Sequence, residues 1–291
     1  MPHEHLHFFC GVDPAPSESQ RSDDGGIVIA CAQPRRLPAA GEALSDNEAD
    51  WWFDYVYARR LTAKEKASAR QWSALLHRLH QQFRFEKIVM DPNQGGRYIQ
   101  RELIQPHQLI NSVESEVTPI ADLKEGPTKV VRADFILHCW ERGDPAIGGS
   151  DGLWPGLPGD DNLNDVLYSE TKEALDHGLI GWPLPWEDWM GDPDRKALLR
   201  QWPEERLWSL KNLTVMQHQF KSVMVATRED GSQLFTKRGA RQFSAVGKKD
   251  LVSAAMYARM AFKIWLRSED WRTALNPEDE CAFSGSGGRS R

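Results

Sequence analysis

The sequence predicts an α/β fold with a mixed central sheet flanked by helices. Short apolar runs bounded by polar turns occupy the start of the chain, as expected of buried strands. Segments with apolar residues at helical spacing follow them. The mean hydropathy is −0.57 and no apolar run approaches the ~18 residues of a membrane span, so a membrane-spanning protein is not expected. The 4 cysteines form no C-x-x-C pair, which favours a reducing, cytoplasmic location over a disulfide framework.

Three strands are predicted before the first helix. His7 to Val12 is an apolar run that ends before Asp13-Pro14, and Ile27 to Ala32 is a second run. Because a polar turn separates these runs, we expect them to pair antiparallel. Trp51 to Tyr57 is rich in aromatic and β-branched residues, which predicts a third strand.

A helix, a strand and a second helix should follow. Thr62 and Glu65 have the spacing of a capping box, and apolar residues at helical spacing predict a helix over 63–82. Ile88–Met90 is a short buried strand, and the apolar residues between Tyr98 and Leu103 suggest another helix. A strand reached through a helix can pair in parallel with the first strand, which makes the sheet mixed.

The second half of the chain is less regular. We expect a helix over Val130–Trp140, a strand within Leu213–Thr227 paired in a hairpin with Leu234-Phe235, and a helix over Asp250–Trp265. The domains expected are a main domain formed by 1–140 and 211–270, an acidic insertion or subdomain at 141–210, and a tail at 271–291 with a flexible end. From Trp140 to Trp208 the chain holds 7 of its 12 tryptophans, so packing by tryptophan is expected in the insertion, with a carbohydrate or peptide cleft as the alternative.

Charge is unevenly distributed along the chain. The formal net charge of −6 argues weakly against nucleic-acid binding. Residues 141–206 hold 15 acidic and 6 basic residues, whereas residues 211–263 hold 10 basic and 3 acidic residues. The basic block surrounds Asp250 and is a candidate surface for phosphate groups.

Three aspartates stand at predicted element ends. Asp13 closes the first strand, Asp91 closes the fourth and Asp250 opens the last helix. Strand ends at one sheet edge and a helix packed over that edge would bring these carboxylates together. Clustered carboxylates repel one another unless cations share the site, and Mg²⁺ and Mn²⁺ prefer oxygen ligands. Each aspartate alone has a simpler explanation, since Asp13 and Asp91 precede prolines in turn-like sequences and Asp250 can cap a helix.

Four stretches resemble motifs of the nuclease domain of phage terminase large subunits. Its opening hairpin is similar to GVDPA at 11–15 and DDGGIVIA at 23–30. Its second acidic motif is similar to VMDPNQGG at 89–96, and its third to FSAVGKKDLVSAAMYA at 243–258. The resemblance covers about residues 7–104 and 213–266.

This resemblance implies a ribonuclease H-like fold and a two-metal endonuclease that cuts concatemeric double-stranded viral DNA during packaging. The ligands of two Mg²⁺ or Mn²⁺ ions would be Asp13, Asp91 and Asp250, with Asp24 or Asp23 as an outer acid. Five basic residues would contact DNA. They are Lys237, Arg238, Arg241, Lys248 and Lys249.

The chain departs from that family in lacking a G-x-x-x-x-G-K-[ST] motif, so it carries no recognisable ATPase motor. The packaging ATPase would be a removed domain or a separate protein, and by family resemblance the portal and small terminase would be further partners. Alternatives are another ribonuclease H-like nuclease (a resolvase, integrase-like enzyme or hybrid nuclease) or a non-catalytic DNA-binding or partner-binding packaging module. A serine hydrolase is disfavoured because no G-x-S-x-G motif is present.

Overall fold

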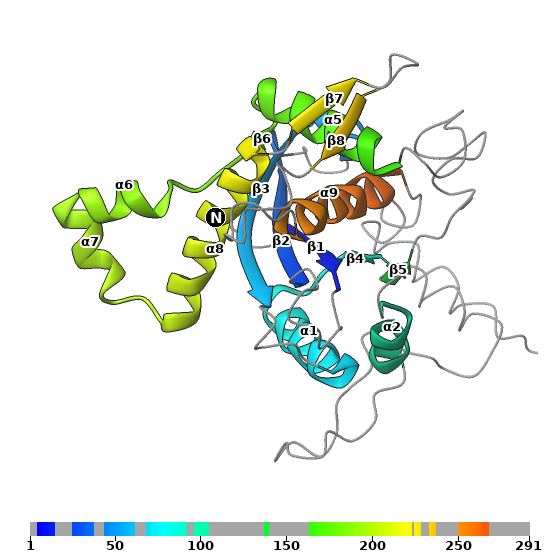
Figure 1. The fold of residues 1–291 in the computed structure, drawn as a ribbon, viewed down its shortest axis with the longest axis horizontal. Coiled ribbons are helices and arrows are strands. Elements are labelled where there is room, and N and C mark those ends of the chain that lie inside the picture. Colours follow the sequence, from blue (N-terminus) through cyan, green and yellow to red (C-terminus); the bar gives the residue numbers. More distant parts are fainter. Residues whose placement is uncertain are drawn as a thin grey trace, which may run out of the picture.

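The computed structural model describes residues 5–14, 25–37, 44–61, 68–91, 96–104, 137–139, 163–222, 224–227, 233–236 and 250–267. Its centre is a 6-stranded sheet with the strand order β5-β4-β1-β2-β3-β6 (Figure 1). The strands are β1 (His7–Asp13), β2 (Gly25–Pro34), β3 (Trp51–Leu61), β4 (Lys87–Met90), β5 (Leu137–Cys139) and β6 (Ile180–Gly181).

The sheet is mixed, as the sequence predicts. Strands β1, β2 and β3 form an antiparallel meander, and β4 pairs in parallel with β1 on the other side. β5 continues the parallel part beyond β4, and β6 pairs in parallel with Phe53 and Asp54 of β3. A second sheet of 2 strands, β7 (Met224–Thr227) and β8 (Gln233–Thr236), confirms the predicted hairpin.

Helices cover both faces of the central sheet. On one face, α1 (Ala69–Phe83) and α2 (Gly96–Ile104) pack against alternate strand residues such as Cys10, Val12 and Met90. On the opposite face, α9 (Asp250–Arg267) packs against Phe9 and Val89, with α5 (Leu163–Asp176) and α8 (Glu204–Ser222) beside it. The period-2 alternation of β1 therefore separates two hydrophobic cores.

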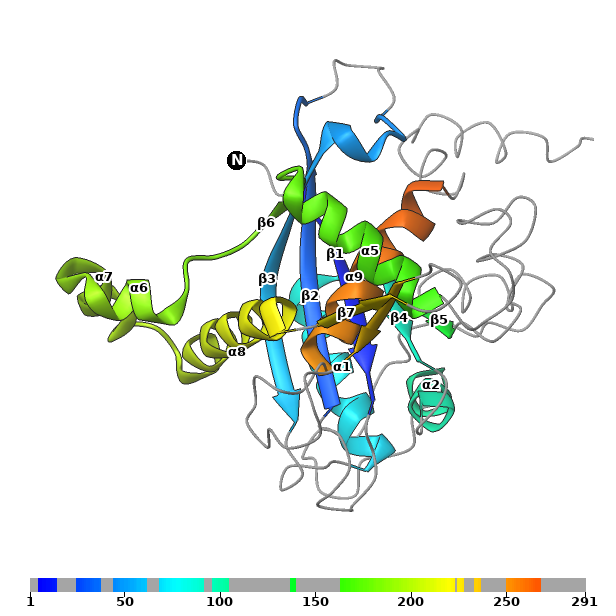
Figure 2. The same ribbon diagram turned by 45° about the horizontal axis from the view of Figure 1, so that its top comes forward.

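Helix α9 is buried along nearly its whole length and lies close to β1 and β2 (Figure 2). Small residues allow the close approach: a Cβ atom added at Gly11 would lie 1.9 Å from the carbonyl oxygen of Ala254. Near the C-terminal end of α9, Trp265 meets Phe9 and Trp51 in edge-to-face contacts with ring centroids 5.3 and 5.5 Å apart. The helix thus runs antiparallel to β1, beginning near the end of that strand.

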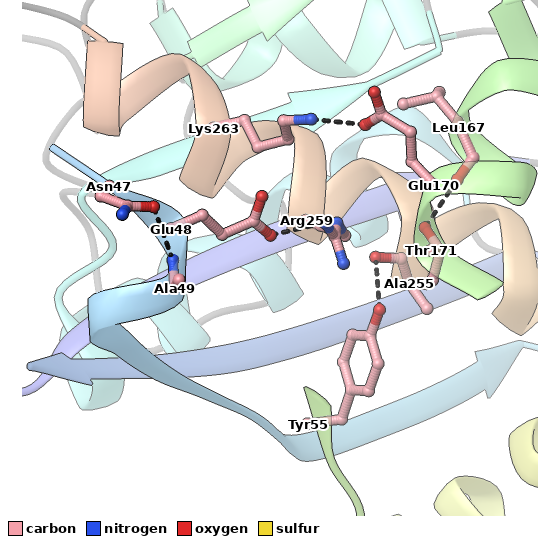
Figure 3. A network of polar contacts seen from close by, with 10 residues as sticks. All are labelled: Asn47, Glu48, Ala49, Tyr55, Leu167, Glu170, Thr171, Ala255, Arg259 and Lys263. Carbon is pink, nitrogen blue, oxygen red and sulfur yellow. Dashed lines mark hydrogen bonds and ion pairs between the residues drawn. The ribbon is translucent and has the colours of Figure 1, made fainter. Parts of the chain in front are cut away.

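Hydrogen bonds and ion pairs join α9 to the elements beside it (Figure 3). Arg259 Nη2 lies 2.5 Å from Glu48 Oε1, in the short 3₁₀ helix η2 (Glu48–Asp50). The Tyr55 hydroxyl donates to the carbonyl oxygen of Ala255 at 3.1 Å, and Lys263 forms an ion pair with Glu170 of α5. These contacts hold α9 to β3, η2 and α5 at once.

The first helix begins later than the sequence predicts. The capping box is formed by Ser68 and Gln71, and α1 begins at Ala69 rather than near residue 63. The predicted box residues Thr62 and Glu65 lie outside the described residues. Both segments have the spacing of a capping box, and local spacing alone cannot decide which of them starts the helix.

One other predicted element is wrong, and a second is shorter than the segment in which it is expected. Residues 137–139, expected in a helix over Val130–Trp140, form β5, and the other residues of that segment lie outside the described residues. A short apolar run fits either structure, and pairing with β4 decides in favour of a strand. A strand is expected within Leu213–Thr227, and the first part of that segment is the end of α8, where Leu213, Met216 and Phe220 are buried at helical spacing. Only Met224–Thr227 is a strand.

The described part of the tryptophan-rich segment begins at residue 163. It contributes Leu167, Tyr168 and Ile180 to the core on the α9 face, and β6 extends the central sheet. Helices α6 (Trp186–Gly191) and α7 (Pro193–Leu199) extend away from the sheet (Figure 1). In the described parts of the chain, no helix has both the length and the hydropathy required to cross a bilayer.

Candidate carboxylate site at the end of the central strands

Asp13 and Asp91 lie at the ends of neighbouring parallel strands. Val12 of β1 is in register with Met90 of β4, and each aspartate is the next residue along its strand. The Asp91 N–H donates to the Val12 carbonyl oxygen at 3.4 Å, so the ladder continues one step beyond β4. Strand spacing then separates the two backbones by about 4.8 Å. Both residues are partly exposed at this edge.

The alternation of side chains places both aspartates on the face covered by α9. Phe9 and Gly11 of β1 contact this helix, and Asp13 follows them in the same period-2 row. Val89 belongs to the same core as α9, and Asp91 follows it two residues later. The two side chains therefore emerge on the same face of the sheet, from adjacent strands.

Asp250 reaches the same edge from the helix. Gly26 is the β2 partner of Asp13, and a Cβ atom added at Gly26 would lie 2.6 Å from the carbonyl oxygen of Asp250. Asp250 is only 2% exposed, and it is the first residue of α9. The start of the helix thus lies over the strand that neighbours Asp13.

Two further contacts position this edge. The Leu251 N–H donates to Gln219 Oε1 at 3.2 Å, so a fully buried side chain of α8 provides an acceptor for the first turn of α9. A Cβ atom at Gly96 would lie 1.9 Å from the carbonyl oxygen of Asp91, which places the start of α2 beside the end of β4. The amino ends of α9 and α2 both lie at the aspartate edge, where helix dipoles favour negative charge.

The possible metal-ligand atoms at this edge are carboxylate oxygens, which suit hard cations such as Mg²⁺ and Mn²⁺. Within the described ranges, no group of three or more His, Cys, Asp or Glu side chains is arranged so that it could hold a metal ion. The structure brings Asp13 and Asp91 to adjacent strand ends and places the Asp250 backbone next to the partner strand of Asp13.

The remaining predicted site residues lie outside the described residues. They are Asp23, Asp24, Lys237, Arg238, Arg241, Lys248 and Lys249. Their contacts with the aspartate edge stay predictions.

Sequence reasoning missed Arg60, which belongs to the same row of residues. Arg60 pairs with Gly26, which in turn pairs with Asp13, and all three positions share one face of the sheet. The edge therefore runs Asp91, Asp13, Gly26, Arg60 across four strands. Alternation continued from the aromatic residues at the start of β3 would have placed Arg59 on this face, but the register shift within β3 puts Arg60 there instead.

Thiol chemistry has no support at Cys10 or Cys31. Full burial raises the pKa of the Cys10 thiol well above its usual value. Burial, and secondarily the charge of Asp54, raises the pKa of Cys31 to about 12. Because the thiolate is the reactive form, these two residues are poor nucleophiles at neutral pH.

Comparisons of the chain with models of protein families, with curated proteins and with solved structures found no match.

Proposed function

We propose that the chain is a two-metal-ion DNA endonuclease of the phage terminase type, cutting concatemeric viral DNA during genome packaging. The observation that carries this proposal is the meeting of Asp13 and Asp91 at adjacent ends of β1 and β4, on the face where α9 begins with Asp250. The four motif stretches that resemble terminase nucleases contain these same three aspartates.

The sheet arrangement supports the finer prediction of a ribonuclease H-like fold. An antiparallel meander of three strands is followed through a helix by a strand parallel to the first, and then by another parallel strand. A mixed sheet flanked by helices is what the terminase resemblance implies. A final helix packed over β1 then supplies the third acid from far along the chain.

In this proposal Asp13, Asp91 and Asp250 would hold the Mg²⁺ or Mn²⁺ ions. Bound ions of this kind lower the pKa of a water for attack on phosphorus and stabilise the leaving oxygen. The ladder between β1 and β4 fixes the spacing of Asp13 and Asp91, so their carboxylates need little reorganisation. Asp250 is itself only 2% exposed, so its carboxylate has little contact with bulk water. No side-chain nucleophile is required.

The test uses Asp13→Asn and Asp91→Asn in the full chain, with Asp188→Asn as the matched control. Asp188 is an exposed acid in the first turn of α6, far from the sheet edge in sequence and structure. Nicking of supercoiled plasmid with Mn²⁺ should be lost in both site variants and kept in the control. Mn²⁺ should also raise the melting temperature of the parent chain and the control but of neither site variant.

Retention of Mn²⁺-dependent nicking by Asp13→Asn would contradict the proposal. Comparing duplex, branched DNA and RNA–DNA hybrid as substrates separates the terminase-type activity from that of a resolvase or hybrid nuclease. A folded parent chain that shows neither Mn²⁺ binding nor nicking would favour a non-catalytic packaging module.

The proposal includes partners. A packaging ATPase, removed from this chain or encoded separately, would supply the motor, and portal and small terminase would be further partners by the family resemblance. Copurification of the chain with such an ATPase, and stimulation of nicking by it, would test this part.

A further inference from the structure

A polar groove of about 460 Å³ lies along the end of β3, between α1 and α8. Both ribbon views place the end of β3 beside these two helices (Figures 1 and 2). Its walls combine arginines, carboxylates and an exposed tryptophan. Its lining includes Arg59, Arg60, Arg78, Glu205, Trp208 and Ser209.

The groove exists because α8, rather than another strand, covers this part of the sheet edge. Strand β6 pairs only with Phe53 and Asp54. Further along β3, the Ala58 N–H donates to Ser209 Oγ at 3.1 Å and its carbonyl oxygen accepts from Asn212 Nδ2 at 3.3 Å. A helix that docks through side chains leaves a channel beside the strand, which a paired strand would fill.

Three guanidinium groups line this channel from two elements. Arg59 and Arg60 are consecutive on β3 and emerge on opposite faces, and Arg78 comes from α1. The nearby acid Glu205 already accepts from the Tyr57 hydroxyl at 3.2 Å and lies 3.7 Å from Arg78. Planar guanidinium groups match phosphate oxygens in geometry and charge.

Trp208 adds an aromatic surface to the groove. Its side chain is 57% exposed, although large aromatic residues usually bury most of their area. The indole N–H donates to Glu204 Oε1 at 3.1 Å, which holds the ring at a defined position on α8. Exposed indoles next to basic groups are the stacking surfaces of single-strand binding sites.

The groove and the aspartate edge share Arg60. Arg60 lines the groove and also stands two strands from Asp13, with Gly26 between them. Two strand spacings amount to about 10 Å, a distance that a few nucleotides of one strand can span. One nucleic-acid strand is therefore long enough to occupy both places.

We propose that this groove binds a single-stranded nucleic-acid segment next to the site of cleavage, with arginines on its phosphates and Trp208 stacked on an unpaired base. The inference rests on the proposed nuclease function and names how the same site holds its substrate. Arg60 contacts a phosphate near the aspartates, and Trp208 holds a base farther away along α8.

The test measures fluorescence anisotropy of a labelled single-stranded oligonucleotide titrated with the full chain in EDTA, at several salt concentrations. Arg60→Ala should weaken binding. It should also lower the slope of log Kd against log salt concentration by about 0.7, the value for one lost phosphate contact. Trp208→Ala should raise Kd about 5-fold or more with an unchanged salt slope, and Trp208→Phe should keep most of the affinity. Circular dichroism melting verifies that each variant is folded.

Matched controls are Arg200→Ala, an exposed arginine at the end of α7, and Trp52→Ala, an exposed tryptophan at the other end of β3. Neither should change Kd or the salt slope. Arg78→Ala, whose side chain is 60% exposed, gives a second test in case Arg60→Ala does not fold.

The inference is overturned if the parent chain does not bind the oligonucleotide, or if the Arg78 and Trp208 variants bind as tightly as the controls. The metal-free readout separates this failure from failure of the proposed function. If the groove variants bind the oligonucleotide as the parent does while nicking depends on Asp13, the groove proposal fails and the nuclease proposal stands. If the groove variants bind more weakly while nicking does not depend on Asp13, the nuclease proposal fails and binding at the groove stands.

Discussion

Gly26 lies directly under the backbone of Asp250, with a hypothetical Cβ atom only 2.6 Å from the Asp250 carbonyl oxygen. The same glycine pairs with Asp13. One residue without a side chain therefore sets both how closely α9 approaches the sheet and how near its first residue comes to the strand end.

Gly26→Ala should move the start of α9 away from the sheet, because the contacting atoms belong to the backbone and cannot rotate aside. We expect a loss of about 1–3 kcal/mol in the free energy of unfolding and a clear loss of Mn²⁺-dependent nicking at temperatures where the variant is folded. The control is Gly191→Ala, where an added Cβ atom meets nothing within 4 Å. Full nicking activity in Gly26→Ala would show that the position of Asp250 does not matter.

Gln219→Leu should loosen the same helix start from the other side. It leaves the buried Leu251 N–H without its side-chain acceptor, at an expected cost of about 1–3 kcal/mol measured by urea unfolding. Gln81→Leu, at an exposed position of α1, should change stability by less than about 0.5 kcal/mol. Equal midpoints for the two variants would contradict the capping role of Gln219.

The ion pair between Arg259 and Glu48 should behave as a buried pair. Arg259 is 5% exposed, and its Nε and Nη1 atoms have no hydrogen-bond partner among the described residues. Glu48→Gln would leave a buried guanidinium without its counter-charge, and we expect a loss of about 3 kcal/mol. Adding Arg259→Met to that variant should recover most of the loss. Chemical denaturation of the single and double variants measures both steps, and an additive further loss would contradict this account.

Acid should destabilise the fold through His77. Burial, with a smaller effect of the charge of His80, lowers the pKa of His77 from 6.5 to about 4. The unfolded chain then binds more protons than the folded one in this window, so stability is full above about pH 6.5 and falls as the pH approaches 4. The loss amounts to at most about 3 kcal/mol.

His77→Gln should flatten the dependence of unfolding free energy on pH over this window, compared with the parent chain. His80 acts in the same direction, because burial lowers its pKa. His177→Gln, at an exposed histidine of the turn after α5, serves as the control. Identical slopes in His77→Gln and the parent chain would refute the assignment.

The elements that hold the aspartates could be predicted because their signals are local. Apolar runs ending at Asp13 and Asp91 mark β1 and β4, and small and apolar residues after Asp250 mark α9. What could not be predicted depends on partners distant in sequence. β3 extends to Leu61 because it pairs with β2 as far as Gly25.

Helix α8 illustrates the same limit. Its buried residues do not form one simple stripe, because it faces β3 through Ser209, α9 through Gln219 and the chain before α6 through Gln217. A helix that packs on several sides loses the amphipathic pattern by which it would be recognised. Arg60 was missed for a related reason: its place beside the aspartates follows from strand register, which single-sequence patterns do not encode.

The burial of α9 has a consequence for biosynthesis. A nascent chain that has emerged as far as β5 already contains Asp13 and Asp91, but its sheet still exposes Phe9 and Val89 until the helix is made. The face can close only after residue 267 has left the ribosome, since the contacts of α9 with β1 join opposite parts of the chain. During translation, the nascent chain would therefore expose the apolar face of the sheet and lack Asp250. Its folding could be completed only when α9, the last helix described, has been synthesised.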